Sequence, residues 1–167
     1  MLVGQAPGPR EEEAGRPFAH TAGKRLFAWF DARGISEESF RKAVYIAAVI
    51  RCFPGRDPKA GGDRVPSREE VARCGVHLDR EMLLLEPSLV IAVGTLAAGL
   101  LIGKTELAKI VGPLFRASRA DHAFDVVVLP HPSGRSTWLN KPENRLLLEG
   151  AISNIVSHGA FRNALGG

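Results

Sequence analysis

Met1-Leu-Val-Gly-Gln-Ala-Pro-Gly8 opens the chain and decides how the rest can be arranged. Three apolar residues run into a turn where Gly4 and Gly8 permit backbone conformations that other residues resist, and Pro7 stiffens the chain. The sequence therefore predicts a short strand at residues 1–3 that ends in a tight turn. In an open α/β sheet, ligands bind outside the carboxyl ends of the strands, so this turn is a candidate site floor. An ordinary strand-to-loop connection has the same composition, and both interpretations stand at this point.

A second strand with a proline-rich turn lies near the other end of the chain. Val126-Val-Val-Leu129 leads into Pro130, and the turn that follows carries a histidine, a serine and an arginine in the run His131-Pro-Ser-Gly-Arg135. If both strands belong to one parallel sheet, their turns meet at the same edge.

Strand-like and helix-like segments alternate between these two turns. Further strands are expected at residues 44–50 and 88–93, and helices at residues 21–33, from Ser36, from Ser67 to about Leu85, at 96–101 and from Asn140. In the last helix, the residues expected to face the core are Leu146, Leu147, Ile152 and Ile155. Residues 103–123 are expected to be irregular, and residues 53–66 to form a long polar loop. The order predicts an α/β fold, a three-layer αβα sandwich with a central, roughly four-stranded parallel sheet.

Composition limits the classes of protein that remain. With 167 residues and 45% hydrophobic content, one compact domain over residues 1–167 is expected. The net charge of +4 permits a nucleic-acid partner without requiring one. We expect a cytoplasmic monomer without a membrane partner, because there is no apolar run of spanning length, no signal-like N-terminus and no coiled-coil pattern. Two cysteines are too few for a secreted disulfide scaffold.

The two turns together resemble the signature motifs of the uracil-DNA glycosylase superfamily. Those motifs are a Gly-Gln-Asp-Pro or Gly-Glu-Ala-Pro-Gly turn after the first strand and a His-Pro-Ser turn after the last. Gly15-Arg-Pro-Phe-Ala-His-Thr-Ala-Gly23 is similar to the Gly-Arg-Pro-Phe-Val-Gly-x-Ala-Gly segment of the family 4 branch. Residues 44–54 and 86–97 follow in the family's order. The resemblance implies a uracil-DNA glycosylase-like fold and a DNA repair enzyme that flips uracil out of DNA and hydrolyses its N-glycosidic bond.

The resemblance also implies roles for individual residues. His131 would donate a hydrogen bond to the uracil O2 and stabilise the departing anion, and Gln5 would place the attacking water. Phe18 would stack on the base. The other residues expected around the base are Ala6, Glu11 and Ala48. The residues expected against DNA are Pro7, Gly8, Ser133, Gly134 and Arg135, of which Arg135 would fill the gap left in the base stack.

Each role has a structural alternative. His131 can simply end a strand, and Phe18 can be a loop residue tucked into the core. Glu11 begins the run Glu11-Glu-Glu13, which reads equally well as a solvated acidic patch, and Arg135 as a surface charge.

Three departures from the family pattern bear on activity. Gln5 replaces the glutamate of one motif and Ala6 the aspartate of the other, so neither position can accept a proton and no catalytic carboxylate is identified. Ala48 stands where family 4 has an asparagine that reads the uracil edge, which predicts weaker discrimination against cytosine. Family 4 also holds an iron–sulfur cluster on four cysteines, of which only Cys52 and Cys74 have counterparts here. We therefore expect no cofactor unless residues that precede Met1 supply the other two cysteines, and we expect a mobile or DNA-contacting loop between Cys52 and Cys74.

Three hypotheses follow. The first is a monofunctional uracil-DNA glycosylase of base-excision repair, whose partners are uracil-containing DNA, single- or double-stranded, its abasic product and free uracil. The second is a glycosylase-like protein that binds abasic sites or another damaged base with weak or no turnover. The third is a small α/β domain that binds a free nucleotide or phosphate at its strand ends.

Overall fold

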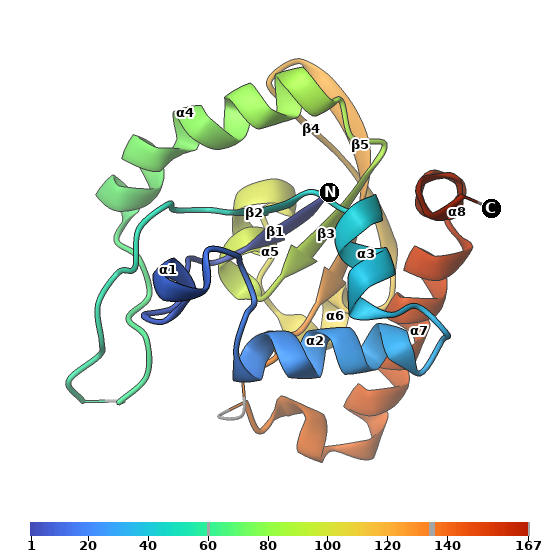
Figure 1. Ribbon diagram of the computed structural model, residues 1–167, viewed down its shortest axis with the longest axis horizontal. Helices are drawn as coiled ribbons and strands as arrows, with labels where there is room; N and C mark the ends of the chain where they lie inside the picture. Colours follow the sequence, from blue (N-terminus) through green and yellow to red (C-terminus); the bar gives the residue numbers. More distant parts are fainter. Residues whose placement is uncertain (60, 134–135, 167) are drawn as a thin grey trace.

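The computed structural model describes residues 1–59, 61–133 and 136–166, apart from the side chain of residue 12, and its centre is a five-stranded sheet (Figure 1). The strand order is β2-β1-β3-β5-β4. The strands are β1 (Leu2–Gly4), β2 (Ile46–Ala48), β3 (Leu89–Val93), β4 (Leu114–Arg119) and β5 (His122–Leu129). The first four strands in this order run parallel, and β4 pairs with β5 in the antiparallel sense.

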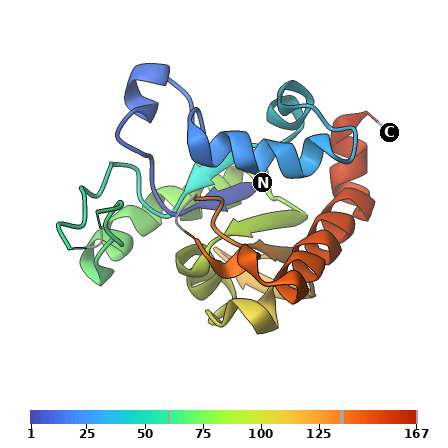
Figure 2. The ribbon, with the colours of Figure 1, turned by 90° about the horizontal axis from the view of Figure 1, so that it is seen from below.

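Helices cover both faces of the sheet. They are α1 (Glu11–Ala14), α2 (Thr21–Asp31), α3 (Glu37–Ala43), α4 (Arg68–Leu85), α5 (Thr95–Ile102), α6 (Leu107–Ile110), α7 (Pro142–Ser157) and α8 (Gly159–Leu165), with a 3₁₀ turn, η1, at Trp138–Asn140. In Figure 2, α2 and α3 (blue to cyan) lie over one face and α5 (olive) over the other. The predicted αβα sandwich is confirmed. Among the described residues, no helix combines the length and apolar content needed to cross a bilayer.

The central strands are apolar throughout because both of their faces are covered. Every residue of β3 is buried, and so are Val126 to Leu129 of β5. Near-continuous hydrophobic runs are typical of parallel strands between two helical layers. On the α2 side, an aromatic cluster joins the helices, since the ring centroids of Phe30 and Phe40 lie 4.5 Å apart and Phe161 of α8 stacks 6.1 Å from Phe30.

The predicted helix starts are confirmed in atomic detail. Ser36 caps α3 by accepting a hydrogen bond from the backbone N–H of Ser39. Ser67 and Glu70 form a reciprocal capping box at the start of α4. That helix ends at Glu86, in the left-handed conformation, immediately before Pro87. Local sequence is enough to place these ends because a cap satisfies backbone groups within one turn.

The prediction of an irregular segment at residues 103–123 is wrong. Gly112 and Pro113 do break the chain, but they separate α6 from β4, so the sheet has five strands. Along β4, half-buried and exposed residues alternate, as expected of an edge strand with one face toward solvent. The second strand is also shorter than predicted. β2 covers three residues at the opposite edge, where Tyr45 is already exposed.

One predicted core residue of the last helix is wrong. Leu146 is 73% exposed, whereas Leu148, Ala151, Ile152 and Ile155 are buried. Those four follow the i, i+3, i+4, i+7 spacing of a single helix face, and Leu146 lies on the opposite side. The prediction of Ile152 and Ile155 is confirmed, and Leu147 is half-buried.

Candidate active site

The strand ends bring the two predicted turns to one edge of the sheet. Because β1 and β5 both pair in parallel with β3, the residues that follow them, Gln5 and Pro130-His131, leave the sheet on the same side. β3 separates the two strands, so their ends lie about two strand spacings, roughly 10 Å, apart. The chain moves from β1 to β2 in one direction and on to β3 in the other, and such a reversal point is where open α/β sheets bind ligands.

The turn after β1 is continued by β2 and covered by Phe18. The carbonyl oxygens of Gly4 and Gln5 accept hydrogen bonds from the N–H groups of Val49 and Ile50, at 2.9 and 3.2 Å. A β-carbon on Gly4 would lie 3.2 Å from Cζ of Phe18. The aromatic ring therefore packs directly over the glycine backbone, which is the close approach that a residue without a side chain allows.

Phe18 is held in a strained conformation by specific contacts. Its φ angle is +53°, in the left-handed region that non-glycine residues seldom adopt. Its N–H donates to Oε1 of Glu11 at 3.0 Å, and its carbonyl oxygen accepts from Nη2 of Arg41 at 3.1 Å. A β-carbon on Gly23 would lie 1.7 Å from that carbonyl oxygen. Strain of this kind persists only where the surroundings over-determine the conformation, and it is common at ligand sites.

Arg41 is a site-supporting residue that the sequence reasoning missed. Its Nη1 donates to the carbonyl oxygen of Pro17 at 2.9 Å, its guanidinium lies 4.5 Å from the centroid of the Phe27 ring, and its Nε donates to Glu37 at 2.8 Å. The spacing of Glu37 and Arg41 signals an ion pair on α3 and nothing more. The contacts with residues 17 and 18 arise only when α3 packs beside the loop.

Glu11 joins the first turn to Phe18 and is not part of a freely solvated patch. The backbone N–H groups of Gly8 and Phe18 both hydrogen-bond to its carboxylate. Burial raises the pKa of Glu11, while these two N–H groups and the charges of His20 and Arg41 oppose that rise. The contacts support a positioning role, in which Glu11 fixes the aromatic ring relative to the Gly-Pro turn.

His131 is oriented as a hydrogen-bond donor. Its Nδ1 accepts from the backbone N–H of Ser133 at 3.2 Å, so the neutral ring carries its proton on Nε2. The ring packs against the backbone of Gly94, where a β-carbon would lie 3.4 Å from Cδ2. Burial lowers the pKa of His131, and the nearby charge of Asp63 works in the opposite direction. Neutral imidazole with an available Nε2–H is therefore the form favoured near neutral pH.

Asp63 is a second residue that sequence reasoning missed. It lies in the loop between β2 and α4, where it forms a backbone bridge with Arg56. The charge of Asp63 raises the pKa of His131, so this carboxylate from the middle of the chain lies near the strand ends. No motif in the polar run around it distinguishes this aspartate from any other loop residue.

The remaining predicted residues lie around these groups or outside the described part of the chain. Ala6, Pro7 and Gly8 are half-buried in the first turn, and Ala48 pairs with Gly4 in the neighbouring strand. Ala48 presents no hydrogen-bonding side chain there. Ser133 is half-buried and its carbonyl oxygen accepts from the N–H of Ser136 at 3.3 Å. Gly134 and Arg135 lie outside the described residues, so their predicted DNA contacts stay predictions.

The described part of the chain also forms hollows away from the residues discussed above. One, of about 300 Å³, lies at the amino ends of the strands and is lined by residues such as Met1, Tyr45 and Phe161. Another, of about 570 Å³, is open and adjoins the turn of His131, with Ser136, Trp138 and Lys141 in its wall.

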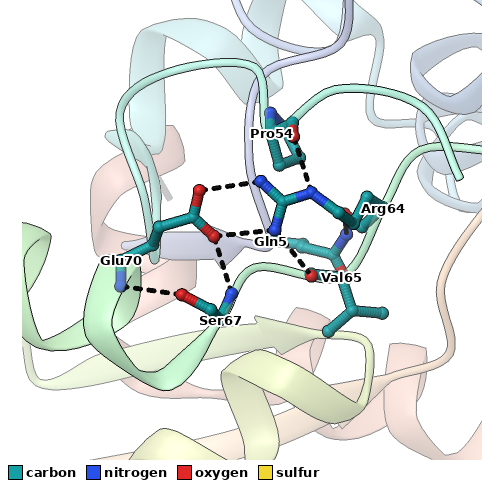
Figure 3. Close-up of polar contacts among 6 residues, drawn as sticks. All are labelled: Gln5, Pro54, Arg64, Val65, Ser67 and Glu70. Atoms are coloured by element: carbon teal, nitrogen blue, oxygen red, sulfur yellow. Dashed lines mark hydrogen bonds and ion pairs between the residues drawn. The ribbon is translucent and has the colours of Figure 1, made fainter.

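The described residues do not fit an iron–sulfur cluster. Cys52 is exposed and Cys74 is half-buried, and these two thiols are half of the four thiolates that such a cluster takes. No group of three or more His, Cys, Asp or Glu side chains in the described part of the chain could hold a metal ion. The loop that carries Cys52 is instead fixed by hydrogen bonds from Arg64 (Figure 3).

Comparison with known proteins identifies the family to which these features belong. The sequence model of the uracil DNA glycosylase superfamily matches residues 1–150. The chain belongs to the uracil-DNA glycosylase superfamily. The predicted resemblance is thereby confirmed.

Curated relatives within the superfamily are named as type-4 uracil-DNA glycosylases. That of Pyrobaculum aerophilum is 32% identical over 150 residues, which are 87% of this chain and 70% of that protein. That of Archaeoglobus fulgidus is 29% identical over 138 residues, 80% of this chain and 64% of that protein. That of Thermotoga maritima is 32% identical over 114 residues, 67% and 54% of the two chains. The matched residues thus span between 54 and 70% of the length of these relatives.

Proposed function

We propose that the protein is a DNA repair glycosylase that excises uracil from DNA by hydrolysing the N-glycosidic bond. The observation that supports this proposal is that the turns of Gln5 and His131 leave the sheet at the same edge, with Phe18 packed over Gly4, in a member of the superfamily. The names of the type-4 relatives support the choice of uracil as the base. Its partner is then DNA from which the target nucleotide has been flipped, because the reacting bond cannot be reached inside a duplex.

The chemistry assigns different tasks to the three side chains. As the bond between C1′ and N1 breaks, its electron pair stays on the base and negative charge develops on the uracil. His131 donates a hydrogen bond from its Nε2–H to this anion. Because the imidazole is largely buried, this hydrogen bond stabilises the negative charge more than it would in water. The ring of Phe18 supports the flat face of the base. Gln5 places the water that adds to C1′, and the proton that this water loses goes to solvent.

The first test is excision under single-turnover conditions. A labelled oligonucleotide with one uracil is incubated with excess protein, and alkali then cleaves the strand at any abasic site. We expect scission with the wild-type protein and a loss of about 100-fold or more in rate for His131→Ala, the magnitude typical of removing one donor to a developing anion. His77→Ala, which changes an exposed histidine on α4, is the matched control. Absence of scission at stoichiometric wild-type protein would contradict the proposal.

The second candidate function is recognition of abasic sites or another damaged base with little turnover. It is favoured by one observation, that positions 5, 6 and 48 carry neither a carboxylate nor an asparagine. Gel shifts on intact, uracil-containing and abasic duplexes distinguish the two functions. Tight binding to the abasic duplex without excision of uracil would favour the binder, and equal binding to abasic and intact duplexes would exclude it.

A further inference from the structure

The loop between β2 and α4 is joined to α4 by two arginine–carboxylate pairs among its described residues, Arg51 to Glu81 and Arg64 to Glu70. Arg64 donates from Nη1 and Nη2 to the two carboxylate oxygens of Glu70, at 2.8 and 2.7 Å. Its Nε donates to the carbonyl oxygen of Pro54 at 2.9 Å (Figure 3). One guanidinium thus joins the start of the loop to the first turn of α4. A two-point Arg–carboxylate pair has a defined geometry, which a single-point contact lacks.

Glu70, the partner of Arg64 in this pair, is itself held by hydrogen bonds. Glu70 accepts a hydrogen bond from the backbone N–H of Ser67 at 2.7 Å, and Ser67 Oγ accepts from the N–H of Glu70 at 3.2 Å. The hydrogen bond from Arg64 first, and then that from the Ser67 N–H, lower the pKa of Glu70 to about 2. The pair is therefore ionised throughout the neutral range. The sequence pattern did not reveal Glu70 as the partner of Arg64, and the expected mobile or DNA-contacting character of this loop stays a prediction.

The backbone of the same residue reaches the candidate active site. The N–H of Arg64 donates to the carbonyl oxygen of Gly55 at 2.9 Å, and its carbonyl oxygen accepts from Nε2 of Gln5 at 3.4 Å. A carbonyl oxygen can only accept, so the amide of Gln5 must turn its NH₂ end toward the loop. Its Oε1 then lies at the other end of the amide, and no described residue donates to that oxygen.

We propose that Arg64 is a positioning residue for the reaction: by fixing its own carbonyl oxygen, it holds the Gln5 amide so that Oε1 accepts a hydrogen bond from the attacking water. This inference rests on the proposed glycosylase function. It explains how a water can be placed where the first turn carries no carboxylate. An unrestrained glutamine rotates about three side-chain bonds, and misplacing a reacting group by about 1 Å can lower a rate on the order of 100-fold.

The main variant is Arg64→Gln, which keeps the backbone carbonyl but releases it from Glu70 and Pro54. Its matched control is Arg51→Gln, which breaks a comparable half-buried ion pair, Arg51 to Glu81 at 2.6 Å, without a contact to Gln5. We expect Arg64→Gln to lower the single-turnover rate on uracil-containing DNA roughly 10- to 100-fold with KM within about twofold of wild type. The control should stay within about twofold in both. Equal losses in the two variants would overturn the proposal.

A double-mutant cycle separates positioning from a general structural role. In a Gln5→Ala background, Arg64 has no amide left to orient, so Arg64→Gln should change the rate by less than about twofold. An undiminished effect of Arg64→Gln in that background would show that Arg64 does not act through Gln5. Arg64→Lys, which keeps the charge but lacks the two-point geometry, serves as a milder variant if Arg64→Gln unfolds. We expect it to fall between wild type and Arg64→Gln.

A third readout does not depend on excision. In the free protein, the side-chain NH₂ resonances of Gln5, assigned through Gln5→Ala, should move to the positions of a mobile glutamine in Arg64→Gln and stay unchanged in Arg51→Gln. Absence of scission by the wild-type protein would refute the glycosylase function, whereas unchanged Gln5 resonances in Arg64→Gln would refute the positioning role on their own. The two failures are therefore distinguishable.

Discussion

At the scale of single residues, two side chains of the candidate site are each held in one orientation by a hydrogen bond to the backbone. The N–H of Ser133 occupies Nδ1 of His131 and so leaves the proton on Nε2. The carbonyl oxygen of Arg64 accepts a hydrogen bond from the NH₂ group of Gln5. In both cases a backbone group binds one end of the side chain. That hydrogen bond leaves Nε2–H of His131 and Oε1 of Gln5 as the groups that can contact a ligand.

The first prediction at this scale concerns the titration of His131. Because burial lowers its pKa, the NMR titration midpoint should fall below the ordinary value of 6.5. The folded state then binds fewer protons than the unfolded state as pH falls below about 6.5, so the free energy of unfolding decreases in that range. Asp63→Asn removes a charge that favours the imidazolium and should lower the midpoint further. A midpoint at or above 6.5 in the wild type would contradict the assignment.

The second prediction concerns Ala48, which lies beside Gly4 in the neighbouring strand. Ala48→Asn adds an amide that can hydrogen-bond to the polar edge of uracil, and one net hydrogen bond corresponds to roughly 2- to 10-fold in affinity. Calorimetry with free uracil should show tighter binding by that factor. Ala48→Leu fills similar space without a polar group and should weaken binding. If Ala48→Asn binds uracil no better than wild type, Ala48 does not face the base.

At the scale of elements, the loops around the candidate site are held by polar side chains of the helices that pack beside them. The first turn of α4 holds the preceding loop through Glu70, and α3 holds the segment around Phe18 through Arg41. Residue 23, within α2, has no side chain, which makes room for the carbonyl oxygen of Phe18. The helices therefore do more than cover the sheet, since their polar side chains fix the site loops.

Gly23→Ala tests this coupling. The new β-carbon would lie 1.7 Å from the carbonyl oxygen of Phe18, so the segment must shift despite the better helix propensity of alanine. We expect a loss of about 2 kcal/mol or more in the free energy of unfolding, measured by urea denaturation. Gly150→Ala in α7, where nothing lies within 4 Å of the added carbon, should instead stabilise by roughly 0.5–1 kcal/mol. Similar effects of the two substitutions would contradict the tight contact at residue 23.

At the scale of the whole molecule, the parallel arrangement of β1, β3 and β5 creates the site. Residues near position 5 and near position 131 come to the same edge of the sheet because β3 pairs in parallel with both strands. The segment between β2 and α4 then folds over the same edge, where Arg64 contacts Gln5. In this arrangement the described part of the chain fixes its loops by ion pairs and caps, and we expect the fold to be independent of bound metal.

The double variant Cys52→Ser/Cys74→Ser tests that expectation. One thiol is exposed and the other half-buried, so replacing both should change the free energy of unfolding by less than about 1 kcal/mol. Thermal melting with and without a strong chelator should give the same midpoint for the wild type. A large loss of stability in the double variant, or with chelator, would show that metal at these cysteines supports the fold.

Local patterns predicted the elements whose determinants lie close together in sequence. The capping motifs at Ser36 and Ser67 placed the starts of α3 and α4 correctly, because each cap acts within a single turn. β4 was missed because an edge strand with one solvated face lacks the apolar run that marked β3. Leu146 was misassigned because adjacent leucines fit more than one helix face until a partner surface is known.

By itself, the sequence determined the class of fold, the two turns that end the strands, and the resemblance to the superfamily that the comparisons confirmed. The tertiary structure alone decided how the site is held: Arg41 reaches the carbonyl oxygen of a residue 23 positions away, and Gln5 reaches one 59 positions away. Backbone carbonyls are identical along the chain, so a pattern of side chains cannot reveal which of them a distant guanidinium or amide will meet. That choice is made only when helices pack against the sheet and bring the partners within hydrogen-bonding distance.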